Sequence, residues 1–223
     1  MREVNLSSAP SSAPSHCGNC SHTPRDIPTI DIWNENTGRY EKQANLPGLI
    51  TCKDDALKTP LAFDPGERWE YGINIDFAGK MVEKVSGQRL EGYFHDHVFG
   101  PLGMADTSFK LSPSQRERLV AMHARDADGS LKPIEFEMPQ EPEFFMGGGG
   151  LYSTGPDYLK FVRMFLNKGS LDGKTLLRPE TVAMMGQNQI GDANVAVLKT
   201  VMPDTRSTPN SSLAWSRNGA SAS

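Results

Sequence analysis

The spacing of apolar residues predicts a pair of helices near the middle of the chain. From Ile75 to Val85 apolar side chains recur at steps of three and four residues, which is the period of an amphipathic helix. Ser86-Gly87 then supplies a stop, because glycine adopts the left-handed conformation that often ends a helix. A second set, from Leu90 to Val98, ends at Gly100-Pro101. The pattern therefore predicts a helical hairpin.

The following residues predict two more helices and one strand. Ser153 or Thr154 can cap a third helix, which Asn167-Lys168-Gly169 would end. A shorter fourth helix is expected from Pro179 through Met185, and Glu135–Met138 alternates briefly, as a strand does. This region is therefore expected to be mainly helical.

Other parts of the chain lack such periodicity. Residues 1–28 contain almost no large apolar side chains, and in the tail 204–223 the apolar content falls until its last residues, 218–223, are small and polar. Neither composition offsets the entropy of ordering, so both are expected to be disordered. From Ile30 to Phe63 scattered apolar residues stand among polar ones, which predicts loops and short turns.

Composition excludes several classes of function. The 23 basic and 27 acidic residues give a net charge of −4 without a basic stripe, which argues against a nucleic-acid partner. No apolar run is long enough for a membrane span and no secretory signal peptide is seen, so a cytoplasmic location is expected. Three cysteines do not suggest a disulfide framework. No motif requires a cofactor or indicates an oligomeric state.

Three ordered motifs carry a resemblance to a known family. They are Asp64–Tyr71, Pro101–Thr107 and Gly147–Thr154. Together they resemble the penicillin-binding-protein-like serine hydrolases, which include class C β-lactamases and family VIII carboxylesterases, and the similarity covers residues 29–203. The resemblance implies the helical middle portion of an α/β fold: mainly α, with long loops, few strands and most of the sheet missing. It also implies hydrolysis of small esters or amides through an acyl-enzyme.

The resemblance places Tyr71 at the family's catalytic tyrosine. That phenol shares proton transfer with a lysine, which requires a neighbouring ammonium to lower its pKa. Asn74 follows one place later than in the Tyr-x-Asn motif, which is more similar to the esterase-like branches than to the β-lactamases. The alternative is a packing residue with its hydroxyl in water. The expected substrate cleft is lined by Trp69, Gly148, Gly149 and Gly150.

The nucleophile of that family is missing. None of the serines is followed three residues later by lysine, as the Ser-x-x-Lys motif demands, and the later Trp-x-Gly or Lys-Thr-Gly motif is broken at Ser212–Arg217. The chain as written is therefore expected to be inactive. The competing interpretation is a non-catalytic protein of the same fold that binds an ester-like or peptide ligand.

A shifted reading frame would account for the missing motif. Codons can be chosen for Pro14–Arg25 that, read one nucleotide earlier, encode Ile-Thr-Leu-Arg-Gln-Leu-Leu-Thr-His-Thr-Ala-Gly. This string resembles the Leu-Leu-Thr-His-Thr-Ser/Ala-Gly stretch that follows the nucleophile in the family. The hypothesis is that residues 1–28, and also the tail after residue 203, are translated out of frame.

The same segment offers a metal site as an alternative. His16, Cys17, Cys20 and His22 include a Cys-x-x-Cys pair of the kind that binds zinc. Against this, the second ligand pair that usually follows a dozen or more residues later is absent. His95 and His97 do not share a helix face and are expected to be solvated.

Overall fold

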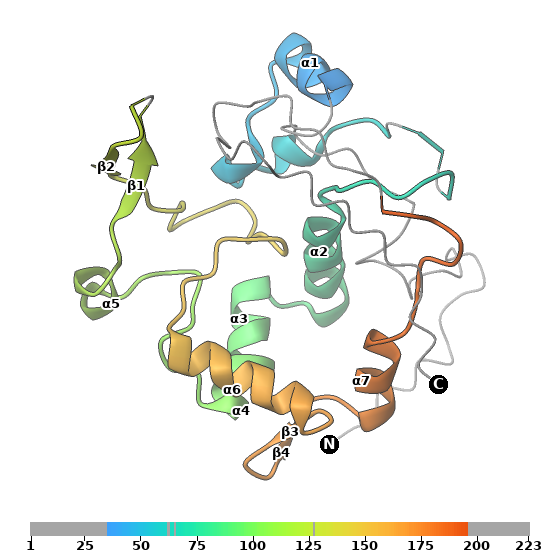
Figure 1. The fold of residues 1–223 in the computed structure, drawn as a ribbon, viewed down its shortest axis with the longest axis vertical. Helices are drawn as coiled ribbons and strands as arrows, with labels where there is room; N and C mark the ends of the chain where they lie inside the picture. The colour runs from blue at the N-terminus through green and yellow to red at the C-terminus, as the bar shows by residue number, and fades with distance from the viewer. Residues whose placement is uncertain (1–34, 62, 65, 127, 196–223) are drawn as a thin grey trace.

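The computed structural model describes residues 35–61, 63–64, 66–126 and 128–195, and these form short helices joined by long loops (Figure 1). The predicted disordered segments 1–28 and 204–223 lie outside these ranges. The helices are α1 (Glu35–Ala44), α2 (Asn74–Ser86), α3 (Leu90–Phe94), α4 (Gly100–Leu102), α5 (Pro113–Glu117), α6 (Gly155–Leu166) and α7 (Pro179–Met185), with single turns η3 (Leu49–Thr51), η4 (Asp54–Leu57) and the π-helical η5 (His95–Phe99). No helix in the described ranges is long and apolar enough to cross a membrane.

Strands are few, as expected. In the described part of the chain they form two antiparallel hairpins, β1 (Met122–Arg125) with β2 (Leu131–Ile134) and β3 (Ser170–Leu171) with β4 (Lys174–Thr175). The strand predicted at Glu135–Met138 is wrong, because these residues are irregular and the strand lies just before them. The position of β2 is set by its pairing with β1 across a tight turn. The alternation of side chains in the sequence does not show which strand pairs with which.

The predicted helices at 74–86, 155–166 and 179–185 are confirmed. Gly87 ends α2 with φ 73°, and its N–H donates to the carbonyl of Glu83. Thr154, one of the two predicted caps, accepts the N–H of Asp157 at the start of α6. These ends follow from local chemistry, so the sequence reveals them.

Two expectations about local structure are corrected. The second helix does not stop at Gly100-Pro101 but continues to Leu102 and ends at Gly103, whose φ is 65°. In η5 the N–H of Gly100 donates to the carbonyl of His95, five residues earlier. This wider turn accommodates Pro101, which has no N–H to donate to the helical hydrogen bonds. The segment from Ile30 to Phe63 contains α1 and two 3-10 turns rather than loops alone, and the polar α1 shows no apolar period.

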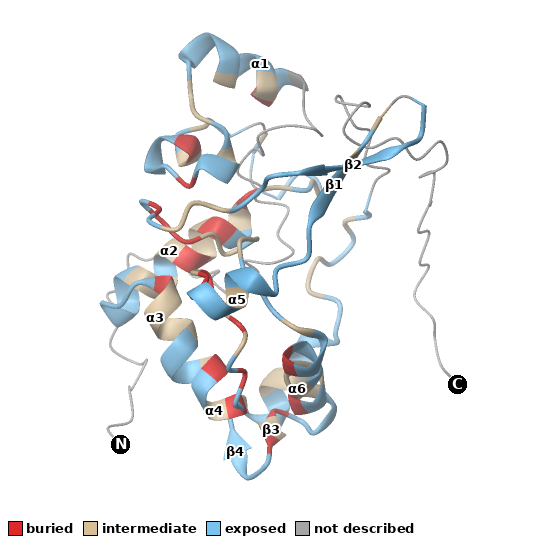
Figure 2. Cartoon of the chain, turned by 90° about the vertical axis from the view of Figure 1, so that its left-hand side faces the viewer, coloured by how far each residue is buried: buried red, intermediate tan, exposed pale blue. Residues whose placement is uncertain are grey.

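The core consists of two clusters of buried side chains. The larger one joins the α3–α4 region to α6 and the β3–β4 hairpin, and its buried members are Phe99, Leu102, Met104, Met164 and Leu171. The smaller one contains Leu90, Phe109 and Phe145, and Phe94 packs against both. Figure 2 shows these buried positions on the inner sides of the helices, whereas α5, β1 and β2 are exposed.

Candidate functional site

Tyr71 lies three residues before the first residue of α2 and is 52% exposed. The loop that leads to it is held by Arg68, whose guanidinium stacks over the Phe63 ring at 3.8 Å and pairs with the Glu70 carboxylate at 3.1 Å. Trp69, between these two charged residues, is partly buried. The first motif thus presents Tyr71 at the amino end of a helix, with its side chain open to solvent.

The glycine run packs against the first turn of the same helix. The N–H of Gly148 donates to the carboxylate of Asp76 at 3.1 Å. A Cβ on Gly147 would lie 2.1 Å from the carbonyl oxygen of Ile75, far inside contact distance, so the backbone approaches too closely for any other residue. The glycine run and the residues that follow the first motif, about seventy residues apart in the sequence, therefore meet at the amino end of α2.

The other two predicted glycines have different surroundings. Gly150 has φ 84°, a conformation that favours glycine, and a Cβ there would meet the Phe109 ring at 3.7 Å. A Cβ on Gly149 would meet Met146 at 3.5 Å. Gly148 is exposed, whereas Gly149 and Gly150 are partly buried. The run is therefore anchored at its first two residues and bends inward at its end.

Asp76 binds the glycine run, and sequence reasoning gave it no role. It is only 2% exposed, and burial raises its pKa despite the N–H groups of Gly148 and Gly147, which act to lower it. Cys52 is also buried, and both burial and the Asp76 charge raise the pKa of its thiol. No ion pair to Asp76 is formed by the residues that the structure describes. The available signal was an acid on an otherwise apolar stretch of the helix.

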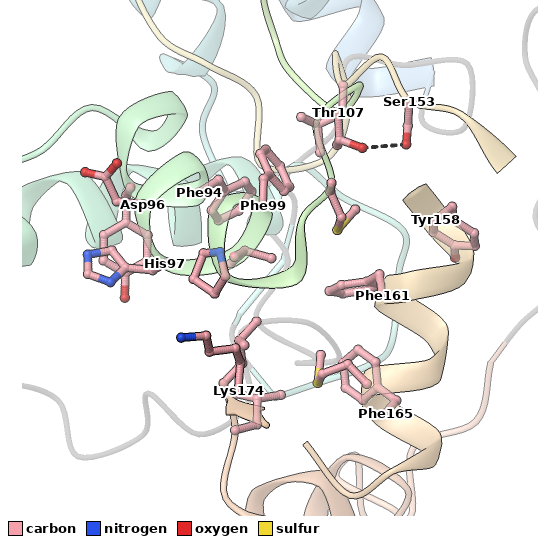
Figure 3. A pocket seen from close by; sticks show the side chains of 18 of the residues that line it. Phe94, Asp96, His97, Phe99, Thr107, Ser153, Tyr158, Phe161, Phe165 and Lys174 are labelled. Atoms are coloured by element: carbon pink, nitrogen blue, oxygen red, sulfur yellow. Dashed lines mark hydrogen bonds between the residues drawn. The ribbon is translucent and has the colours of Figure 1, made fainter. Parts of the chain in front are cut away.

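A large cavity lies elsewhere, between α3, η5 and α4 on one side and α6 with the β3–β4 hairpin on the other (Figure 3). Its volume is about 990 Å³. Neither Tyr71 nor Trp69 lines it, and neither do Gly148, Gly149 and Gly150. The predicted cleft residues and this cavity are therefore separate features of the molecule.

Two of the histidines considered in the sequence lie at the surface. His95 is exposed and its Nδ1 lies 2.9 Å from the Asp96 carboxylate, in agreement with the solvated surface expected for it. His97 is also exposed and borders the cavity. The described ranges hold no group of three or more residues that could bind a metal ion. The zinc candidates His16–His22 lie outside those ranges.

The chain is similar in structure and in sequence to several known proteins. Simvastatin Synthase (LovD) from Aspergillus terreus is 30% identical and superposes with a TM-score of 0.63 over 76% of this chain and 42% of its own. The chain is also similar to the lovastatin esterase of Penicillium rubens, at 33% identity over 74% of this chain and 40% of the relative. It is 38% identical to the monacolin J acid methylbutanoyltransferase of Aspergillus terreus, over 59% of this chain and 32% of the relative.

These neighbours indicate the class of the penicillin-binding-protein-like serine hydrolases. The family described as Beta-lactamase matches residues 40–205, which is more than half of the 223 residues. The chain therefore belongs to the β-lactamase family. It spans about two fifths of the length of the lovastatin esterase.

Proposed function

We propose that this chain is an esterase-like member of the family in which Tyr71 keeps the position of the catalytic tyrosine, and that it does not turn over substrate as written. One observation carries the proposal: the Asp76–Gly148 hydrogen bond holds the glycine run against the first turn of α2, the helix that follows Tyr71, while the 223 residues contain no Ser-x-x-Lys. The relatives support ester chemistry, since their names describe an esterase and an acyltransferase.

The chemistry that the site would serve is acyl transfer. A phenolate at Tyr71 would take the proton of a serine hydroxyl, the serine oxygen would attack the ester carbonyl, and the alcohol would leave with that proton. Water or another alcohol would then release the acyl group. This chemistry needs both the serine that forms the acyl bond and the lysine that shares the proton transfers with Tyr71, and the motif that supplies them is missing, so the reaction does not start. The substrate class that the family chemistry implies is a small ester or amide.

Hydrolysis of a chromogenic short-chain ester tests the proposal. Purified chain and p-nitrophenyl butyrate are expected to give the same rate as Tyr71→Phe and as the control Tyr40→Phe, which removes the hydroxyl of an exposed tyrosine on α1. A wild-type rate well above background that Tyr71→Phe alone abolishes would overturn it. A ligand that raises the melting temperature without turnover would favour the alternative, a non-catalytic binding protein.

The origin of the missing motif is a separate proposal. A shifted reading frame over residues 1–28 and again after residue 203 would remove the nucleophile and the later sheet motif together, and with them most of the family's sheet. The resemblance of the alternative reading of Pro14–Arg25 to the stretch after the nucleophile supports it. Codons in the DNA that do not permit that reading would overturn it.

A further inference from the structure

The cavity between α3–α4 and α6 has the size and walls of a ligand site. At about 990 Å³ it stands at the upper end of the range for small-molecule pockets. Figure 3 shows Phe94 and Phe99 facing Phe161 and Phe165 across the space. These rings also pack on the larger core cluster, so the protein's own packing fixes their positions.

One end of the cavity is polar, and its polar side chains already form hydrogen bonds with one another. The hydroxyls of Thr107 and Ser153 are 2.7 Å apart, and Thr107 also donates to the buried carboxylate of Asp157 at 3.2 Å. Burial acts to raise the pKa of Asp157, but the hydrogen bond from Lys160 and the N–H of Asp106 outweigh it and the pKa is lowered. This end is a structural network that does not require a ligand.

The opposite end carries a cation. Lys174, on the β3–β4 hairpin, lines the cavity together with His97. No carboxylate of the described ranges lies within ion-pairing distance of Lys174. Asp96 also lines the cavity and accepts from His95 at 2.9 Å and Gln88 at 3.4 Å. The hydrogen bond with His95 lowers the pKa of Asp96, so its carboxylate keeps a negative charge and an anion must bind away from it, at Lys174. At Lys174 an anion would therefore meet an exposed ammonium that no carboxylate of the described residues pairs with, beside an apolar wall.

We propose that this cavity binds an aliphatic carboxylate, a medium-chain fatty acid, with the hydrocarbon chain between the phenylalanine rings and the carboxylate at Lys174. The apolar walls favour a hydrocarbon, because burial of each methylene is favourable, and the single lysine selects the charge of the head group. The site goes beyond the proposed ester chemistry, since Tyr71 and the glycine run do not line it.

Methyl NMR of ¹³C-labelled methionines locates the ligand. Decanoate is expected to shift the signals of Met104 and Met164, which line the cavity, and to leave those of Met81 and Met184 in place, which are exposed and do not line it. Octanoate, shorter by two methylenes, is expected to bind roughly tenfold more weakly. Equal shifts of all four methyls, or no shift at Met104 and Met164, would overturn the site.

Head-group substitution tests the role of Lys174. Lys174→Gln is expected to weaken decanoate about threefold to fivefold and to leave uncharged decanol unchanged, and decylamine is expected to bind least. Lys84→Gln, which neutralises an exposed lysine on α2, is the control and is expected to change nothing. Unchanged decanol binding also shows that the variant is folded. If decanoate binds Lys174→Gln as tightly as wild type, the assignment of the carboxylate is wrong.

Discussion

The hydrogen bond from Gly148 to Asp76 should hold the glycine run in place, and Asp76→Ala tests this directly. The substitution removes the acceptor of a 3.1 Å hydrogen bond at a residue that is 2% exposed. Loss of a hydrogen bond to a charged group costs about 1.5–3 kcal/mol, and the lower end applies here because Gly148 is exposed and water can replace the lost acceptor. A decrease of about 1.5 kcal/mol in the free energy of unfolding is therefore expected, together with faster amide exchange at Gly148.

Asp76→Asn separates the acceptor from the charge. An amide oxygen still accepts from Gly148, so the decrease should be less than about 1 kcal/mol. Because the pKa of Asp76 is raised in the folded state, its contribution to stability is full below the unfolded pKa and is lost as pH rises through the folded pKa. Wild type should therefore lose stability relative to Asp76→Asn as the pH rises.

Urea unfolding followed by circular dichroism between pH 4 and pH 8 measures both effects. Asp192→Asn, which changes an exposed aspartate near the end of the described residues, is the control and should follow wild type at every pH. The reasoning is refuted if Asp76→Ala unfolds with the same midpoint as wild type. It is also refuted if Asp76→Asn becomes the less stable of the two as the pH increases.

Three further substitutions follow from the same contacts. Gly147→Ala should destabilise by about 2–3 kcal/mol, because its Cβ would lie 2.1 Å from the Ile75 carbonyl, whereas Gly155→Ala, with open space around it, should not; urea midpoints compare them. Burial raises the Glu41 pKa to about 7, so the wild-type protein loses stability as this carboxyl group ionises. Glu41→Gln should therefore be more stable than wild type by about 1 kcal/mol above pH 7 and not at pH 5, which melting curves at both pH values check. Thr154→Ala should cost about 1 kcal/mol by thermal unfolding, since it removes the cap of α6.

The parts of the fold that the sequence predicts are those with local causes. The ends of α2 and α6 depend on Gly87 and Thr154, which act within a few residues of their own position. The helix α1 escaped prediction because its ten residues, including Tyr40 as the one large apolar side chain, carry no apolar period. The π-turn η5 escaped it because proline ordinarily breaks a helix, and the wider turn that accepts Pro101 has no sequence signal.

The candidate site was also predicted only where its residues stand in local motifs. Tyr71 and the glycine run were found because they stand in motifs, but the motifs do not say which atoms join them. The link is Asp76, a long-range contact to Gly148 that no local pattern reports. The cavity was missed altogether, since its walls are phenylalanines and methionines that resemble ordinary core residues in sequence.

Intact-mass analysis after treatment with a fluorophosphonate tests the central claim most directly. Such reagents phosphonylate an activated serine, and the claim is that Tyr71 stands in this chain without a serine to activate. The account predicts that the mass of the purified chain stays unchanged while a family member that keeps Ser-x-x-Lys gains one adduct. A single stoichiometric adduct on a serine of this chain, lost in Tyr71→Phe, would contradict it.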